Sequence, residues 1–254
     1  HGTNRSEPEV FKKGDDFRHI DWAVWARHGD LLIRRFLEDA NLAMHLVLDA
    51  SMSMSVGQPS KWDAARRIVA GISYVALARL DEVQVSTFSE TLSEPFRISR
   101  SAQMNVLFAL LTNLKLSEGR GSFDRAVDHF LGQRRPAGVV VCLSDFMFVD
   151  RLSEGLARLR HAGHEVQLLQ ITAAEEASPE IGSFTLVDAE TAETRDVVVD
   201  RDRQQQYQGL FEDFLHESRQ DAHRQGCRLI HVTSDVPAEQ AIIRWLGAHE
   251  FQSP

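Results

Sequence analysis

The chain has 254 residues, of which 43% are hydrophobic, and a formal net charge of −9 at pH 7. This length and composition indicate a globular protein with one large core rather than a disordered chain. The negative charge argues against a general nucleic-acid binder or a binder of anionic membranes. No apolar run approaches the length of a membrane span and no signal-peptide pattern opens the sequence, so we expect a cytoplasmic protein without a membrane span.

The first forty residues are polar and rich in aromatic and charged side chains. We predict that residues 1–40 form an N-terminal extension packed on a main domain of residues 41–254. Within the extension, Leu31 to Phe36 is interpreted as an edge strand. The only two cysteines, Cys142 and Cys227, lie in apolar segments typical of strands, and we expect them to be reduced core residues.

From Leu42 onward, predicted strands alternate with predicted helices. Ser60 is expected to cap the first helix, with Asp63 completing a capping box, and Val106, Leu107, Leu110 and Leu114 are expected on one side of a later helix. The predicted strands are 42–48, 83–88, 139–143, 166–171 and 228–232, with a short hairpin of 184–187 and 197–199. The predicted helices are 61–80, 101–116, 123–131, 152–161, 204–225 and 238–246. This alternation predicts an α/β, Rossmann-like fold whose mostly parallel central sheet carries helices on both faces.

One strand of this series ends in a group of oxygen-bearing side chains. The apolar run Leu46 to Leu48 is followed by Asp49, Ser51 and Ser53. Loops after the carboxyl ends of parallel strands form the ligand sites of open α/β sheets. One carboxylate and two hydroxyls are the hard oxygen ligands that suit Mg²⁺. This segment therefore predicts a site for a divalent cation.

Two later residues are expected at the same edge of the sheet. Ser122 opens a helix after a glycine-rich loop, and Asp145 follows the strongly apolar strand that ends near Leu143. If adjacent strands converge there, Asp49, Ser51, Ser53, Ser122 and Asp145 surround one ion. Without a cation, Asp49 and Asp145 would repel each other, and one of them would tend to hold a proton.

The order of these residues resembles the metal-ion-dependent adhesion site of von Willebrand factor A domains. That pattern is Asp-x-Ser-x-Ser followed by Thr and then Asp, and here Ser122 stands in the Thr position. The resemblance covers Leu42 to about Leu246. It implies binding of Mg²⁺, with Mn²⁺ or Ca²⁺ as further candidates, and an open coordination position that an acidic residue of a protein partner fills. Met52 and Met54 flank the serines, and one of them is a candidate for an adaptable apolar rim that contacts this partner.

A second resemblance lies near the N-terminus and extends over nearly the whole chain. The segment Gly14-Asp15-Asp16-Phe17-Arg18-His19-Ile20-Asp21-Trp22 resembles a signature of the bacterial domain-of-unknown-function 58 family. Further matching segments are Lys61-x-x-Ala64, Leu143-Ser144-Asp145-Phe146, Gly163-His164-Glu165-Val166 and Leu186-Val187-Asp188-Ala189-Glu190. The resemblance implies a von Willebrand factor A-type domain that acts as an adaptor with a MoxR-type AAA+ ATPase or its client.

The charged residues of this signature have two interpretations. Asp15, Asp16, Arg18 and Asp21 either pin the extension to the domain through mutual ion pairs, with Trp22 supplying buried area, or form part of a docking surface for the partner.

Three function classes remain open from the sequence. A phosphate-binding loop, a nucleophile elbow and a zinc motif are all absent, which favours a non-enzymatic, metal-dependent interaction module. A Mg²⁺-dependent phosphatase or phosphotransferase would need a second acid two residues after Asp49, where Ser51 stands, and a lysine that we do not expect near Asp145. A metal-free structural scaffold is the third alternative.

Overall fold

The computed structural model describes residues 8–10, 32–34, 43–78, 82–117, 121–147, 152–187 and 193–250. The chain divides into two compact units, His1–Leu42 and Ala43–Pro254. In the first unit, β1 (Pro8–Val10) and β2 (Leu32–Arg34) form an antiparallel two-stranded sheet of their own. Within the segment predicted as an edge strand, Leu32–Arg34 is a strand, and it pairs with β1. That the extension packs on the main domain stays a prediction.

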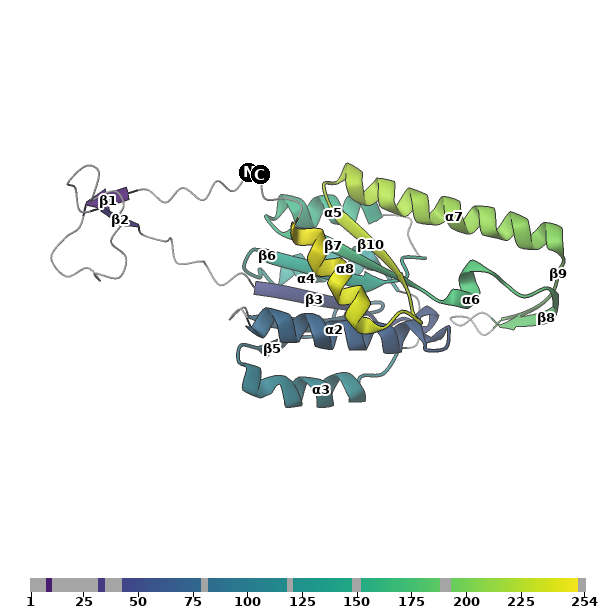
Figure 1. Ribbon diagram of the computed structural model, residues 1–254, viewed down its shortest axis with the longest axis horizontal. Coiled ribbons are helices and arrows are strands. Elements are labelled where there is room, and N and C mark those ends of the chain that lie inside the picture. The colour runs from purple at the N-terminus through teal and green to yellow at the C-terminus, as the bar shows by residue number, and fades with distance from the viewer. Residues whose placement is uncertain are drawn as a thin grey trace. The chain divides into compact units, whose positions relative to one another are not determined.

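The second unit is built on a six-stranded sheet. Its strands lie in the order β10–β7–β6–β3–β4–β5 (Figure 1). All neighbouring strands are parallel except β4 and β5, which pair antiparallel at one edge. The strands are β3 (Ala43–Asp49), β4 (Val83–Phe88), β5 (Phe96–Ile98), β6 (Gly138–Ser144), β7 (Glu165–Thr172) and β10 (Arg228–Thr233).

Helices cover both faces of this sheet, as the alternating sequence pattern predicts. Side chains of a strand point to opposite faces in turn, and β3 accordingly places Leu46 and Leu48 in one core and Val47 in the other. The first core is completed by α2 (Lys61–Ala78), α3 (Met104–Asn113) and α8 (Ala238–Glu250). The second is completed by α4 (Phe123–Gly132), α5 (Leu152–His161) and the end of α7 (Arg201–Arg224).

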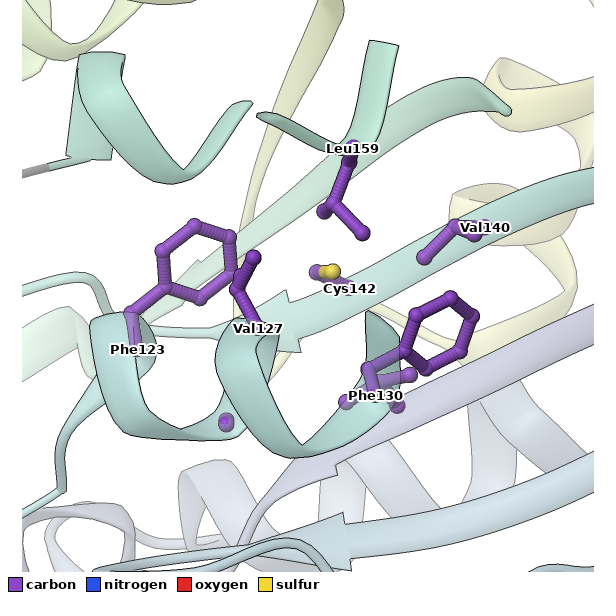
Figure 2. A pocket seen from close by; sticks show the side chains of 8 residues that line it. Phe123, Val127, Phe130, Val140, Cys142 and Leu159 are labelled. Carbon is purple, nitrogen blue, oxygen red and sulfur yellow. The ribbon is translucent and has the colours of Figure 1, made fainter. Parts of the chain in front are cut away.

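The second core contains both cysteines, and Cys142 lines a small cavity within it. Phe123, Val127 and Phe130 of α4 point toward Cys142 of β6, and Leu159 of α5 closes the space from the other side (Figure 2). Both cysteines are free and buried, as predicted, and burial raises the pKa of the Cys142 thiol far above its usual range. This small apolar cavity is therefore part of the packing and offers no reactive group.

The predicted elements correspond to observed ones, with differences at edges and ends. The capping residue is confirmed, because the Ser60 hydroxyl accepts a hydrogen bond from the Asp63 amide at 3.1 Å. The Asp63 carboxylate instead pairs with Arg66. The predicted helix 101–116 begins as a 3-10 turn and ends at Asn113, and Val106 is 55% exposed rather than on its buried side. Strand β5 was not predicted.

The irregular interval after β7 contains the predicted hairpin. A four-residue helix, α6 (Ala174–Ala177), precedes β8 (Gly182–Val187) and β9 (Thr194–Val199), which pair antiparallel with Phe184 opposite Val197. Figure 1 shows α6 and the hairpin beyond the carboxyl end of β7.

A buried histidine near the amino-terminal end of β3 is expected to make the stability of the fold sensitive to acid. His45 is fully buried, and burial lowers its pKa from 6.5 to about 4 against a weaker, opposing hydrogen bond to the Pro136 carbonyl. A base with a lowered folded-state pKa loses stability as pH falls from 6.5 toward 4. We expect this residue to remove about 3 kcal/mol from the free energy of unfolding over that range.

Denaturant unfolding at stepped pH measures this effect. His45→Gln is expected to flatten the acid side of the stability profile, whereas His161→Gln, at an exposed site on α5, is expected to leave it unchanged. Equal acid slopes in wild type and His45→Gln would contradict this assignment.

Candidate metal-binding site

Two aspartates lie at the carboxyl end of the central strands. Asp49 is the last residue of β3, and Asp145 directly follows β6, the parallel neighbour of β3. Both side chains are completely buried. The sheet thus places two predicted cation ligands on adjacent strands, because parallel strands end at the same edge.

The carboxylate of Asp49 is held by hydrogen bonds on both oxygens. Oδ1 accepts the backbone N–H of Ser51 at 2.8 Å, and Oδ2 accepts the hydroxyl of Ser144 at 2.6 Å. Burial, and next the negative charge of Asp145, raise the pKa of Asp49 to about 6, although these hydrogen bonds oppose the shift. The direction of this shift agrees with the expected repulsion between the two aspartates.

The two serines of the motif follow Asp49 in a single turn. The Ser51 and Ser53 hydroxyl oxygens lie 3.1 Å apart, and Ser53 belongs to a short 3-10 helix, Met52–Ser55. Ser51 is fully buried and Ser53 is half-buried. The motif thereby brings two hydroxyl oxygens together beside the Asp49 carboxylate.

A lysine that the motif does not include neutralises Asp145. The Lys61 ammonium donates to Asp145 Oδ2 at 2.7 Å and to Glu176 Oε1 at 2.5 Å, and its side chain is completely buried. Burial lowers the pKa of Lys61, but the charges of Asp145 and Glu176 outweigh it, and the net shift is upward. Lys61 is therefore a permanently charged internal cation.

Local backbone geometry explains how these groups reach each other. Gly57 has a φ of +97°, and a Cβ there would lie 2.8 Å from the Ala173 Cβ, so this loop can approach β7 closely only with glycine. On the other side, Phe146 has a φ of +56°, a strained value for a bulky residue. Its amide donates to the Ser144 hydroxyl at 2.9 Å, and the Met147 amide donates to Asp145 Oδ1 at 3.0 Å. These bonds fix the turn that presents Asp145.

Ser122 lies at the same edge but makes a different contact. Its backbone N–H donates to the carbonyl of Ser89. Ser89 directly follows Phe88, the β4 residue that is paired with Asp49 of β3. Its hydroxyl caps α4 by accepting the Arg125 N–H at 3.4 Å. Among the described residues, no hydrogen bond joins this hydroxyl to Asp49, Asp145 or the other two serines. Its role as a ligand stays a prediction.

The donor set of this cluster suits a hard divalent cation. It offers carboxylate and hydroxyl oxygens with no thiol or imidazole. The Lys61 ammonium bonds two of its three carboxylates, Asp145 and Glu176, while Asp49 is bonded by Ser51 and Ser144. Nowhere in the described ranges do three or more His, Cys, Asp or Glu side chains form a metal cluster, so any ion here depends on the serine hydroxyls. The residues present fit the predicted ion in type and charge.

Three residues of this edge were missed by the sequence interpretation: Lys61, Ser144 and Glu176. The expectation that no lysine lies near Asp145 is wrong, because Lys61 contacts it. The signals for Lys61 and Ser144 are the Lys61-x-x-Ala64 and Leu143-Ser144-Asp145-Phe146 segments, whose family resemblance assigns these two residues no role.

Other predicted features have no structural outcome. Asp15, Asp16, Arg18 and Asp21 lie outside the described residues. No helix in the described part of the chain is long and apolar enough to cross a membrane. The cytoplasmic location stays a prediction.

Comparisons with known proteins confirm the resemblance to the domain-of-unknown-function 58 family. The family described as "Protein of unknown function DUF58" matches residues 9–220. An uncharacterized protein of Mycobacterium tuberculosis (strain ATCC 25618 / H37Rv) is 28% identical over 206 residues, which cover 78% of this chain and 64% of that protein. An uncharacterized protein of Mycobacterium bovis gives the same values. The chain thus spans less than two thirds of the length of these curated relatives.

The similarities to solved structures are at low sequence identity. BatB, a conserved hypothetical protein from Bacteroides thetaiotaomicron, superposes with a TM-score of 0.51 at 16% identity over 82% of this chain and 98% of that chain. The VWA domain of SpRpn10 gives a TM-score of 0.45 at 11% identity over 80% of this chain and 93% of that chain. With its family match and its parallel sheet, this chain belongs to the DUF58 family and has a von Willebrand factor A-type fold.

Proposed function

We propose that this protein is a non-enzymatic interaction module that binds Mg²⁺ at the carboxyl edge of its sheet. Asp49, Ser51, Ser53, Ser122 and Asp145 hold the ion, and an acidic residue of a protein partner completes its coordination. Mn²⁺ and Ca²⁺ are further candidates for the site, since both accept oxygen ligands. The partner implied by the family resemblance is a MoxR-type AAA+ ATPase or its client.

The observation that carries this proposal is the excess of negative over positive charge in the buried cluster. Asp49 and Asp145 are both fully buried, and within the described residues the only ammonium bonded to either of them is that of Lys61, which Asp145 shares with Glu176. Ionised carboxylates in a low-dielectric site are costly without a counter-ion. Burial, and next the repulsion by Asp145, raise the pKa of Asp49 to about 6, and a divalent cation between the two aspartates would remove that repulsion.

The contacts of Lys61 argue against a phosphatase. In that chemistry a lysine balances the charge of the bound phosphate, but the Lys61 ammonium is completely buried and already bonded to Asp145 and Glu176. Position 51 also carries a serine whose hydroxyl is bonded to that of Ser53. An acid for the leaving group is therefore missing where the reaction would need it.

The methionines beside the motif differ in what they offer a partner. Met54 is completely buried in the core, whereas Met52 is half-buried beside Ser53. Of these two candidates, Met52 is the one that we assign to the rim of the docking surface, because a flexible thioether adapts to varied apolar partners.

Binding to a purified MoxR-type ATPase, measured by biolayer interferometry with Mg²⁺ present throughout, tests this proposal. Keeping Mg²⁺ constant leaves the nucleotide state of the ATPase unaffected, so the variable is the variant and not a chelator. We expect Asp49→Asn to weaken binding at least tenfold (about 1.4 kcal/mol), because the partner carboxylate loses the ion that it would coordinate.

The control is Asp124→Asn, which removes one carboxylate from a half-exposed ion pair with Arg158 at the start of α4. It is expected to bind the ATPase as wild type does. Equal affinity of Asp49→Asn and wild type would contradict a metal-mediated contact with this ATPase.

A further inference from the structure

The buried pair Lys61 and Glu176 lies beside the proposed ion but outside the set of ligands. Lys61 is the first residue of α2 and Glu176 lies in α6, so the two come from segments 115 residues apart. Their contact is short, 2.5 Å, and Lys61 contacts Asp145 at 2.7 Å. A proposed ligand is thus linked through one ammonium to a third carboxylate.

Glu176 is itself fixed in place. Its Oε2 accepts the backbone N–H of Ala173 at 2.7 Å, while Oε1 accepts the Lys61 ammonium. Its side chain is only 14% exposed. Bonds to both oxygens hold Glu176 next to Lys61. Its negative charge lies close to the site in a region that water screens weakly.

We propose that Lys61 and Glu176 are positioning residues that set the cation affinity of this site in opposite directions. The inference rests on the proposed function. The Lys61 ammonium repels a divalent ion and competes with it for the Asp145 carboxylate, which lowers the affinity. Glu176 draws the ammonium to its own carboxylate and offsets its charge, which raises the affinity. Together they let the protein hold the buried Asp145 without metal and still admit an ion.

Calorimetric titration of the purified protein with Mn²⁺, and separately with Mg²⁺, tests this inference. Lys61→Met is expected to tighten binding about tenfold or more, because it removes a positive charge within several ångströms of the ion. Glu176→Gln is expected to weaken binding about tenfold, because Lys61 is then left to Asp145 alone. The double variant Lys61→Met/Glu176→Gln removes one charge of each sign and is expected to bind within about threefold of wild type.

The directions of the changes in cation affinity distinguish this role from simple structural damage. Damage to the site would weaken binding in every variant, so tighter binding by Lys61→Met supports the electrostatic role. The matched control is Glu175→Gln, the same charge change at an exposed neighbouring position, which should leave the affinity unchanged.

Weaker binding by Lys61→Met, or unchanged binding by Glu176→Gln, would overturn the inference while leaving the metal site in place. If Lys61→Met does not fold, the double variant decides, because a recovery from the loss in Glu176→Gln to within about threefold of wild-type affinity cannot come from damage. If neither wild type nor any variant releases or absorbs heat or gains thermal stability with either ion, the metal site of the proposed function fails as well.

Discussion

Replacing Asp49 with asparagine is expected to make the metal-free protein more stable. The folded-state pKa of Asp49 is raised from 3.8 to about 6 by burial and by Asp145, so its ionised form is disfavoured in the native state. Above pH 6 this shift corresponds to at most about 3 kcal/mol of native-state destabilisation. Asparagine keeps an acceptor for the Ser51 amide and carries no charge. We expect its melting temperature at pH 7.5 in chelator to rise by a few degrees.

The same pKa shift predicts in which direction the stability of the wild type changes with pH. An acid whose pKa is raised on folding binds more protons in the native state than in the unfolded state between the two pKa values. The Asp49 contribution therefore weakens the wild type as pH rises from about 4 to about 6. Asp49→Asn should lack that decline. Because His45 acts in the opposite direction over part of this range, the comparison is made in the His45→Gln background.

Added cation should offset most of this difference in stability between wild type and Asp49→Asn. At about one hundred times its dissociation constant, Mg²⁺ would stabilise the wild type by about 2.7 kcal/mol, whereas Asp49→Asn should not respond. Differential scanning calorimetry in chelator and in excess Mg²⁺ measures both effects. A variant less stable than wild type in chelator would contradict the repulsion between Asp49 and Asp145, and an equal response to Mg²⁺ would contradict Asp49 as a ligand.

The sequence predicted the fold well because its strands are buried on both faces. Such strands are near-continuous apolar runs, and the run ending at Leu143 could be identified without any tertiary information. The edge strand β5 has only three residues and one buried side chain, Ile98, so it carries no comparable pattern. Val106 was misassigned because α3 is apolar on more than one side, which hides the period of its buried face.

The candidate site was predictable only in part, for a different physical reason. Asp49, Ser51 and Ser53 are close in sequence, and one turn brings them together. Lys61 and Asp145 are 84 residues apart, and their contact depends on how the loop at Gly57 folds against β7. Local patterns carry no information on such a contact. The unexpected ion pair is thus a product of tertiary packing, and it changes the charge on which any metal-binding argument depends.

Removing the second aspartate is expected to have the opposite effect on stability. Asp145→Asn leaves the buried Lys61 ammonium with Glu176 as its only charged hydrogen-bond partner among the described residues. Breaking a buried ion pair from one side costs about 3–5 kcal/mol, and the remaining contact to Glu176 and the relief of Asp49 reduce this. We expect a loss of about 2–4 kcal/mol in the free energy of unfolding, measured by urea denaturation in chelator at pH 7.5.

A double-mutant cycle separates the ion pair from other effects of this change. In the Lys61→Met background, Asp145→Asn should cost much less than in wild type, because no ammonium is left without its partner. Asp124→Asn, at the half-exposed pair with Arg158, should cost about 1 kcal/mol or less. Equal costs of Asp145→Asn in both backgrounds would mean that Lys61 does not stabilise Asp145. Asp49→Asn and Asp145→Asn are expected to change the stability in opposite directions. That result would mean that only one carboxylate of the proposed site has its counter-ion within the protein. A divalent cation would supply the counter-ion for the other.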